Sequence, residues 1–183
     1  TVKMRDTLAD LTHLLNRLVG EKITLTLSHD PVLKSIRADK RQLEQVLMNL
    51  VVNARDAMPA GGEIRIETEI TTLTTPLMRD RATVSAGSYV TVKVSDEGGG
   101  IAPEMLQKIF EPFYTTKQPG EGVGLGLAIS SSIITELGGS LTARNGQSGG
   151  AVFELQLPLH NSVHNTANAT PSAPNADPIQ AAE

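Results

Sequence analysis

Apolar residues recur every three or four positions over residues 42–58, the spacing that places them on one face of a helix. The members of this face are Leu43, Val46, Leu47, Leu50, Val51, Ala54 and Met58. Beside it, Asn49, Asn53 and Asp56 form a polar row with helical spacing. Asparagine is a poor residue for a helix interior, because its amide competes for backbone hydrogen bonds. The row indicates either side chains that look into a site or amides that are satisfied or solvent-facing, and the helix alone leaves both interpretations open.

The remaining pattern predicts a mixed α/β chain. Helical periodicity predicts helices over residues 7–19 and 124–137, and a proline start signal predicts a short one over 103–110. Alternating apolar residues predict strands over residues 22–27, 35–38, 63–71, 89–96, 141–144 and 151–157, with a loop or partial hairpin over 72–88. The last two strands can pair as antiparallel neighbours. We therefore expect an α/β (α+β) two-layer sandwich, a mixed sheet with about three helices on one face and solvent on the other.

Composition narrows the function classes. The 183 residues suffice for one domain with tails, and a formal net charge of −4 offers no electrostatic case for a nucleic-acid partner. The absence of cysteine excludes a disulfide scaffold, a thiolate metal site and a cysteine nucleophile. No apolar run approaches the roughly 20 residues of a membrane span, so we expect no direct membrane contact from this segment.

Glycines concentrate in the second half of the chain, where twelve of the sixteen lie between Gly98 and Gly150. Gly98 and Gly100 follow a predicted strand that ends on Asp96, and a Gly-x-Gly-x-Gly run at 122–126 precedes a predicted helix. Glycine lets a backbone approach a ligand closely, and a helix N-terminus offers free N–H groups and positive partial charge. The arrangement suits a nucleotide, with a carboxylate for the base and a helix start for the phosphates, although either glycine set alone could be a tight turn.

Two common nucleotide-binding motifs are absent. The glycines at 98–100 open no long helix and have no acidic residue at the distance that a Rossmann unit requires. No Gly-Lys-Ser/Thr sequence occurs, which excludes a P-loop.

Four motifs together resemble one known domain. They are Asn49-x-x-x-Asn53, Asp96-x-Gly98-x-Gly100-Ile101, Phe110-Glu111-Pro112-Phe113-Tyr114 and Gly122-x-Gly124-Leu125-Gly126-Leu127. In order and approximate spacing they resemble the N, G1, F and G2 boxes of the catalytic and ATP-binding domain of two-component sensor histidine kinases. The resemblance covers about residues 22–158. Within the family, the chain looks most like PAS-containing hybrid kinases. It implies the Bergerat-type ATP-binding fold shared with gyrase, Hsp90 and MutL (the GHKL superfamily), with a mobile ATP lid over residues 110–123.

The resemblance also implies roles for the matched residues. Asp96 would accept a hydrogen bond from the adenine amine, and the backbone would approach base and sugar at Gly98, Gly100 and Ile101. Asn53 would coordinate Mg²⁺ through its amide oxygen, with Asn49 as a candidate second ligand, since a hard cation prefers oxygen ligands.

The phosphates would be held by the lid and by the G2 box. The implied nucleotide contacts there are Phe110, Thr115, Thr116, Lys117, Gly122, Gly124, Leu125, Gly126 and Leu127. Family members often place a basic or aromatic residue just after the position of Asn53; here Arg55 is the candidate for that phosphate role, in a sequence that departs from the usual pattern. The catalytic set would then be Asn49, Asn53, Arg55 and Lys117. Lys108 is a weaker cationic candidate, and we expect it to be a solvated helix residue.

The phospho-acceptor is not expected within this chain. In the family it is a histidine on a separate dimerisation domain, followed by an acidic residue and, further along a long helix, by a proline. His13 lacks both followers, and His29 precedes Asp-Pro but lies in a predicted turn. His160 and His164 lie in a segment without Lys, Arg or aromatic residues, which is predicted to be disordered.

These expectations divide the chain into three parts. Residues 1–20 would be a helix at the end of the connection to a missing dimerisation and histidine-acceptor domain. Residues 21–159 would be the ATP-binding kinase domain, and residues 160–183 a disordered tail or linker. The implied partners are that dimerisation domain and a response regulator or receiver domain, and the implied location is cytoplasmic.

Three functions remain open. The leading one is the kinase half of a sensor histidine kinase, which binds ATP–Mg²⁺ and donates the γ-phosphate to the acceptor histidine. The second is an ATPase of the GHKL type, in which a Glu one turn before the Mg²⁺ ligand activates water. Asn49 occupies that position, and an amide cannot take the proton. The third is a non-catalytic nucleotide-sensing module, against which four intact boxes argue. Ser130–Ser132 offers no aromatic ring to stack a cyclic dinucleotide.

Overall fold

The computed structural model describes residues 1–31, 34–79, 82–115 and 125–159. The helices are α1 (Met4–Val19), α2 (Lys40–Asp56) and α3 (Gly126–Glu136). The strands are β1 (Val2–Lys3), β2 (Ile23–His29), β3 (Ser35–Ile36), β4 (Gly62–Leu73), β5 (Leu77–Arg79), β6 (Ala82–Val84), β7 (Gly87–Asp96), β8 (Ser140–Asn145) and β9 (Ala151–Pro158). Two small strand pairs, β1–β3 and β5–β6, lie outside the main sheet.

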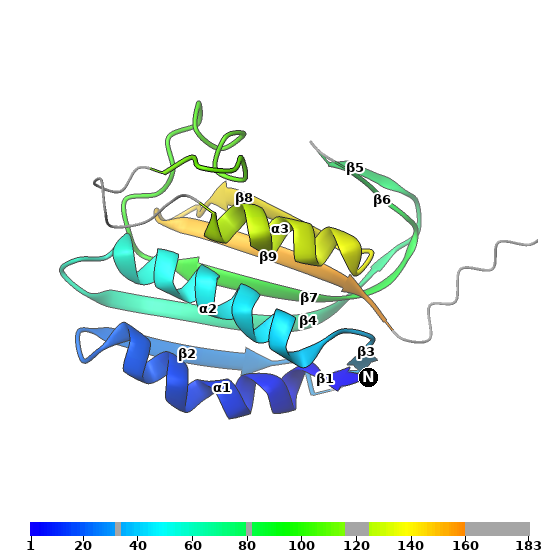
Figure 1. Ribbon diagram of the computed structural model, residues 1–183, viewed down its shortest axis with the longest axis horizontal. Coiled ribbons are helices and arrows are strands. Elements are labelled where there is room, and N and C mark those ends of the chain that lie inside the picture. The colour runs from blue at the N-terminus through cyan, green and yellow to red at the C-terminus, as the bar shows by residue number, and fades with distance from the viewer. Residues whose placement is uncertain (32–33, 80–81, 116–124, 160–183) are drawn as a thin grey trace, which may run out of the picture.

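The main sheet has five strands in the order β2-β4-β7-β9-β8. Within it only one pair of neighbouring strands, β2 and β4, is parallel, because α2 lies between them in the sequence and carries the chain back across the sheet. All three helices cover the same face of this sheet (Figure 1). The predicted α+β two-layer sandwich, with a mixed sheet on three helices, is therefore confirmed.

The core lies between the helices and this face of the sheet. All seven positions of the predicted apolar face of α2, including Met58 just beyond its end, are at most 4% exposed. They meet inward-pointing side chains of β4 and β7, namely Ile64, Ile66, Val90, Val92 and Val94. Asp39 caps α2, with its carboxylate accepting the N–H of Arg41 at 2.9 Å. Aliphatic packing thus fixes α2 over the centre of the sheet.

The topology brings the end of α2, the start of β4 and the end of β7 together at one edge of the sandwich. Because β7 runs antiparallel to β4, Asp96 at the end of β7 pairs with Ile64 near the start of β4. The loop that joins α2 to β4 lies at this same edge, so the end of α2 lies there as well (Figure 1). The N box and the G1 box therefore meet at this edge.

Three predicted elements differ from the structure, whereas the loop or partial hairpin predicted over residues 72–88 agrees with it. Helix α1 begins at Met4 rather than at residue 7, and no side chain caps it. Strand β2 continues through His29, whose ring bonds Thr68 of β4. Residues 72–88 do contain a hairpin, β5–β6. The short helix predicted over residues 103–110 is wrong: most of its backbone bonds, such as Lys108 N–H to Met105 O at 2.8 Å, span three residues and form turns.

A local pattern explains that wrong prediction. In 103–110 only the adjacent residues Ile109 and Phe110 are buried, so the segment has no apolar stripe to hold a helix against the core.

The outer face of the sheet also departs from the solvated surface that was expected, since Thr91 and Gln156 on it are 1% and 2% exposed.

Candidate functional site

A cavity of about 1160 Å³ opens at the edge where α2 and β7 end. Six residues expected to touch the nucleotide line it, namely Asn53, Arg55, Asp96, Gly100, Ile101 and Leu127. They come from α2, the end of β7, the segment after it and the first turn of α3. Residues up to 74 positions apart thus share one cavity, which supports the grouping that the motifs indicate.

Asp96 is the best-defined polar group in the cavity. Its side chain is buried, with 7% of the residue exposed. One carboxylate oxygen, Oδ1, accepts the N–H of Gly98 at 2.9 Å and that of Ala151 at 3.2 Å. The other oxygen, Oδ2, accepts no hydrogen bond from the part of the chain that the structure describes. The carboxylate is therefore oriented through one oxygen and keeps the second for a ligand with an N–H donor.

Two glycines allow the backbone to close around Asp96. A Cβ on Gly98 would lie 2.6 Å from the carbonyl oxygen of Ala57, just after α2. Gly150 has φ +73°, and a Cβ there would collide with the carbonyl oxygen of Asp96. Only glycine tolerates both the contact and the backbone angle. The sequence predicted that Gly98 would let the backbone approach a ligand; in the structure its close contact is with the backbone of Ala57, and the contact of Gly150 was not predicted.

Ile101 is held by a side chain that the sequence did not reveal. The Asn145 amide accepts the N–H of Ile101 and donates to its carbonyl oxygen, both at 2.7 Å. Gly100 has φ +76°, and a Cβ there would lie 2.8 Å from the Asn145 oxygen. Asn145 thus ties the end of β8 to the G1 segment across 44 residues. Its sequence context, an Asn-Gly at a turn, gives no sign of this contact.

The two asparagines of the polar row have different surroundings. Asn53 is half-buried and lines the cavity, and its side chain makes no hydrogen bond within the described residues. Asn49 instead donates through Nδ2 to the carbonyl oxygen of Gly126 at 3.2 Å and to the Ser130 hydroxyl at 3.1 Å. Both open interpretations of the row therefore hold, one for each residue. Asn49 joins α2 to the first turn of α3.

Arg55 makes contacts other than the predicted phosphate contact. Its Nη1 donates to the carbonyl oxygen of Leu18 at 3.0 Å, in the last turn of α1. Its Nε and Nη2 donate to Asp56 Oδ1 at 3.1 and 3.0 Å. The guanidinium thus satisfies a carbonyl at the end of α1. Lys108 is exposed, as a solvated residue would be, and Lys22 lines the cavity as a cation that was not predicted.

The F and G2 boxes are described in part. Phe110 is buried and packs edge-on against Phe153, a cavity-lining residue, with ring centroids 6.4 Å apart. Thr115 is exposed. Leu125 precedes Gly126, the first residue of α3, and no side chain caps this helix. The remaining expected contacts of this region lie outside the described residues: Thr116, Lys117, Gly122 and Gly124.

The first turn of α3 therefore presents uncapped N–H groups beside the cavity, which Leu127 lines. Such groups carry positive partial charge and bind phosphates. Asp96, with its available oxygen, lines the same cavity. The arrangement can hold a molecule that has an N–H donor at one end and an anion at the other.

Two further features of the described residues concern metal ligands and membrane spans. No group of three or more His, Cys, Asp or Glu side chains in them could hold a metal ion. None of the helices in this part of the chain has the length and apolar character that crossing a membrane requires.

Comparison with known proteins places these features in a family. Residues 38–161 match the family described as histidine kinase-, DNA gyrase B-, and HSP90-like ATPase. Over 155 residues the chain is 43% identical to the sensor kinase CckA of Brucella abortus, covering 85% of this chain and 16% of the relative. It is 43% identical over 127 residues to the two-component sensor PprA of Pseudomonas aeruginosa, covering 68% and 12%. The sensor histidine kinase ZraS of Salmonella typhimurium is 36% identical, covering 87% and 31%.

Solved structures agree with the sequence relatives. The full-length structure of ShkA in complex with AMPPNP superimposes with a TM-score of 0.67 at 28% identity, covering 86% of this chain and 30% of that chain. The catalytic domain of the histidine kinase ThkA, in a nucleotide-free form, has a TM-score of 0.62 at 31% identity and covers 85% and 89%. The chain spans less than a third of each of the three sequence relatives. It belongs to the histidine kinase-, DNA gyrase B-, and HSP90-like ATPase family, on the branch of the sensor histidine kinase catalytic domains.

Proposed function

We propose that this domain binds ATP–Mg²⁺ and donates the γ-phosphoryl group to a histidine on a separate dimerisation domain. The observation that carries the proposal is the Asp96 carboxylate, which is buried, held through Oδ1 and available through Oδ2. It shares one cavity with Asn53 and with the start of α3. These three features supply an acceptor for the adenine amine, an amide oxygen for a cation and N–H donors for phosphates.

The residues of the chain divide the work of binding. Asp96 would take a hydrogen bond from the exocyclic amine of adenine, which guanine cannot donate from that position. Asn53 fits a Mg²⁺ site, because its amide lines the cavity and has no partner among the described residues. When bound, Mg²⁺ neutralises charge between the phosphates. The uncapped N–H groups at the start of α3 would orient the phosphate chain.

Phosphoryl transfer needs positioning and charge stabilisation more than a protein nucleophile. The acceptor histidine is therefore proposed to lie on the partner domain. His13 and His29 do not line the cavity, and His29 is engaged with Thr68 at 2.9 Å. His160 and His164 lie outside the described residues.

Hydrolysis by a GHKL-type ATPase mechanism is disfavoured by Asn49. The position one turn before the proposed Mg²⁺ ligand carries an amide that already donates to Gly126 and Ser130. An amide at this place cannot remove a proton from water, so the second candidate function lacks its base. A response regulator or receiver domain as the final phosphoryl acceptor, and a cytoplasmic location, are part of the proposal for the whole protein.

Transfer in trans tests this function. The 183-residue chain with ATP and Mg²⁺ should turn over very slowly, and adding a histidine-bearing dimerisation domain should yield an acid-labile phosphohistidine on that domain. Steady hydrolysis of ATP by the chain alone, abolished by Asn53→Ala, would overturn the kinase proposal in favour of an ATPase. Phosphate on His13 or His29 would overturn the placement of the acceptor.

A further inference from the structure

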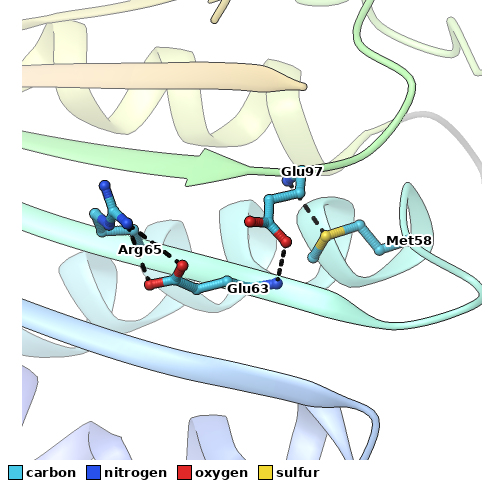
Figure 2. Close-up of polar contacts among 4 residues, drawn as sticks. All are labelled: Met58, Glu63, Arg65 and Glu97. Atoms are coloured by element: carbon cyan, nitrogen blue, oxygen red, sulfur yellow. Dashed lines mark hydrogen bonds and ion pairs between the residues drawn. The ribbon is translucent and has the colours of Figure 1, made fainter. Parts of the chain in front are cut away.

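We propose that Met58 is a positioning residue for Asp96, acting through the peptide that links Asp96 to Glu97. This inference rests on the proposed role of Asp96 as the acceptor for adenine. The thioether sulfur of Met58 accepts the N–H of Glu97 at 3.3 Å, across 39 residues of sequence. Figure 2 shows the contact, with the methionine extending from the end of α2 toward the segment that follows β7.

A second contact anchors the same residue on β4. The Glu97 carboxylate accepts the N–H of Glu63 at 2.9 Å, and Glu63 also pairs with Arg65 at 3.3 Å (Figure 2). Glu97 is thus bonded through its backbone to Met58, just beyond the end of α2, and through its side chain to β4. Rotation of the peptide between Asp96 and Glu97 would break the first of these bonds.

The space for this arrangement is provided by Gly62, which has φ +150°. A Cβ on Gly62 would lie 2.8 Å from the Met58 sulfur and 3.1 Å from Glu97 Oε2. Any larger residue at position 62 would push the sulfur or the carboxylate out of place. Met58 can therefore approach Glu97 because position 62, at the start of β4, carries no side chain.

The peptide after Asp96 is confined from both sides. Gly150 packs closely against the carbonyl oxygen of Asp96, and the Met58 sulfur holds the N–H of Glu97 on the same peptide. The side chain of Asp96 is held through Oδ1 by Gly98 and Ala151. With the peptide and Oδ1 both fixed, the direction of Oδ2 is fixed as well. Met58 lies two residues after the end of α2, so within this set it is the residue that couples that direction to the helix that carries Asn53.

Methionine suits this place for a chemical reason. Met58 is 4% exposed, so its side chain also packs in the core, and an aliphatic residue of similar volume could do that part. Only the sulfur can in addition accept a hydrogen bond, although a weak one. The apolar spacing of α2 predicts a core residue here and gives no sign of the second role.

The experiment is a double-mutant cycle on ATP affinity, measured with Mg²⁺ by NMR titration of the 183-residue chain. Met58→Leu removes the acceptor with little change in volume and should weaken ATP binding about two- to threefold, the low end of the range for one hydrogen bond, because a thioether is a weak acceptor. In an Asp96→Asn background the same substitution should have no further effect, because the group it positions is gone. Met48→Leu is the control: it makes the same change at a partly buried residue of α2 that packs against the core and does not line the cavity, and it should leave affinity unchanged.

The outcomes separate this inference from the proposed function. If Asp96→Asn weakens ATP binding and Met58→Leu does not, the inference is overturned and the adenine assignment stands. If Met58→Leu weakens binding equally in both backgrounds, Met58 acts on the fold or the cavity wall and not through Asp96, which also overturns it. If Asp96→Asn itself has no effect on ATP affinity, the proposed role of Asp96 is refuted, and the inference about Met58 falls with it. Faster hydrogen exchange at the Glu97 amide in Met58→Leu is expected in the folded variant, and unchanged exchange would contradict the contact.

Discussion

Replacing Asp96 by Asn tests the nucleotide site most directly, because the structure predicts the geometry of the variant. The amide oxygen of Asn can still accept the two N–H bonds that now reach Oδ1, from Gly98 and Ala151. That choice puts the amide NH₂ where Oδ2 was, at the position proposed to face adenine. An acceptor is thus replaced by a donor opposite another donor, and the negative charge is lost.

The size of the effect follows from that change. Losing a hydrogen bond to a buried charged group costs about 1.5–3 kcal/mol, which is a factor of about 10 to 150 in the dissociation constant. Unfolding stability should change much less, since both bonds within the protein are retained. The preference for ATP over GTP should also shrink, because an NH₂ group can donate to the carbonyl that guanine carries in place of the adenine amine.

The assay is titration with a fluorescent ATP analogue, with GTP as a competitor and the thermal midpoint as a check of folding. Glu67→Gln makes the same carboxylate-to-amide change at an exposed position outside this cavity and serves as the control. Unchanged ATP affinity in a folded Asp96→Asn variant would refute the assignment of Asp96 to adenine. An equal loss in Glu67→Gln would show that net charge, and not the contact, governs affinity.

Three further predictions concern Asn53 and Asn49 in the polar row and His29 on the edge strand β2. Asn53→Ala should abolish the Mg²⁺ dependence of ATP affinity, as measured by titration with and without Mg²⁺; a wild-type Mg²⁺ response would contradict the ligand role. Asn49→Ala should keep that response but lower the free energy of unfolding by about 1–3 kcal/mol, since the buried Ser130 hydroxyl loses its donor; denaturant unfolding measures this. Burial and the nearby Arg5 charge lower the pKa of His29 below 6.5, so the unfolded chain takes up a proton first as the pH falls. Stability should therefore decline below about pH 6.5, more steeply than in His29→Gln, and parallel pH profiles of the thermal midpoint would argue against it.

Local sequence was a good guide to the secondary structure. The periodicity of α2 and the alternation in β4, β7 and β9 placed the core side chains correctly, because burial on one face imposes these spacings. The prediction for residues 103–110 was wrong because a start signal at Pro103 was accepted without an apolar stripe to support it. The start of α1 was misplaced because no side-chain cap marks it.

The candidate site was predicted only as far as motifs reach. Asp96 and Asn53 were recognised because each belongs to a short motif with a fixed order along the chain. Asn145, Gly150 and Met58 were missed because each acts on a residue at least 39 positions away. Contacts of that kind depend on which strands become neighbours, and β9 lies beside β7 although α3 and β8 separate them in the sequence.

Asn49 and Asn53 show where the boundary lies. They are identical amides one turn apart on α2, and the sequence alone determined that both lie on one side of a helix beside a buried face. Only the tertiary structure decided that α3 packs against Asn49 and takes its amide hydrogens, whereas Asn53 remains at the cavity. The physical reason is that a helical period specifies direction around one axis, while a hydrogen-bond partner depends on a second helix whose place is set by the packing of the whole core.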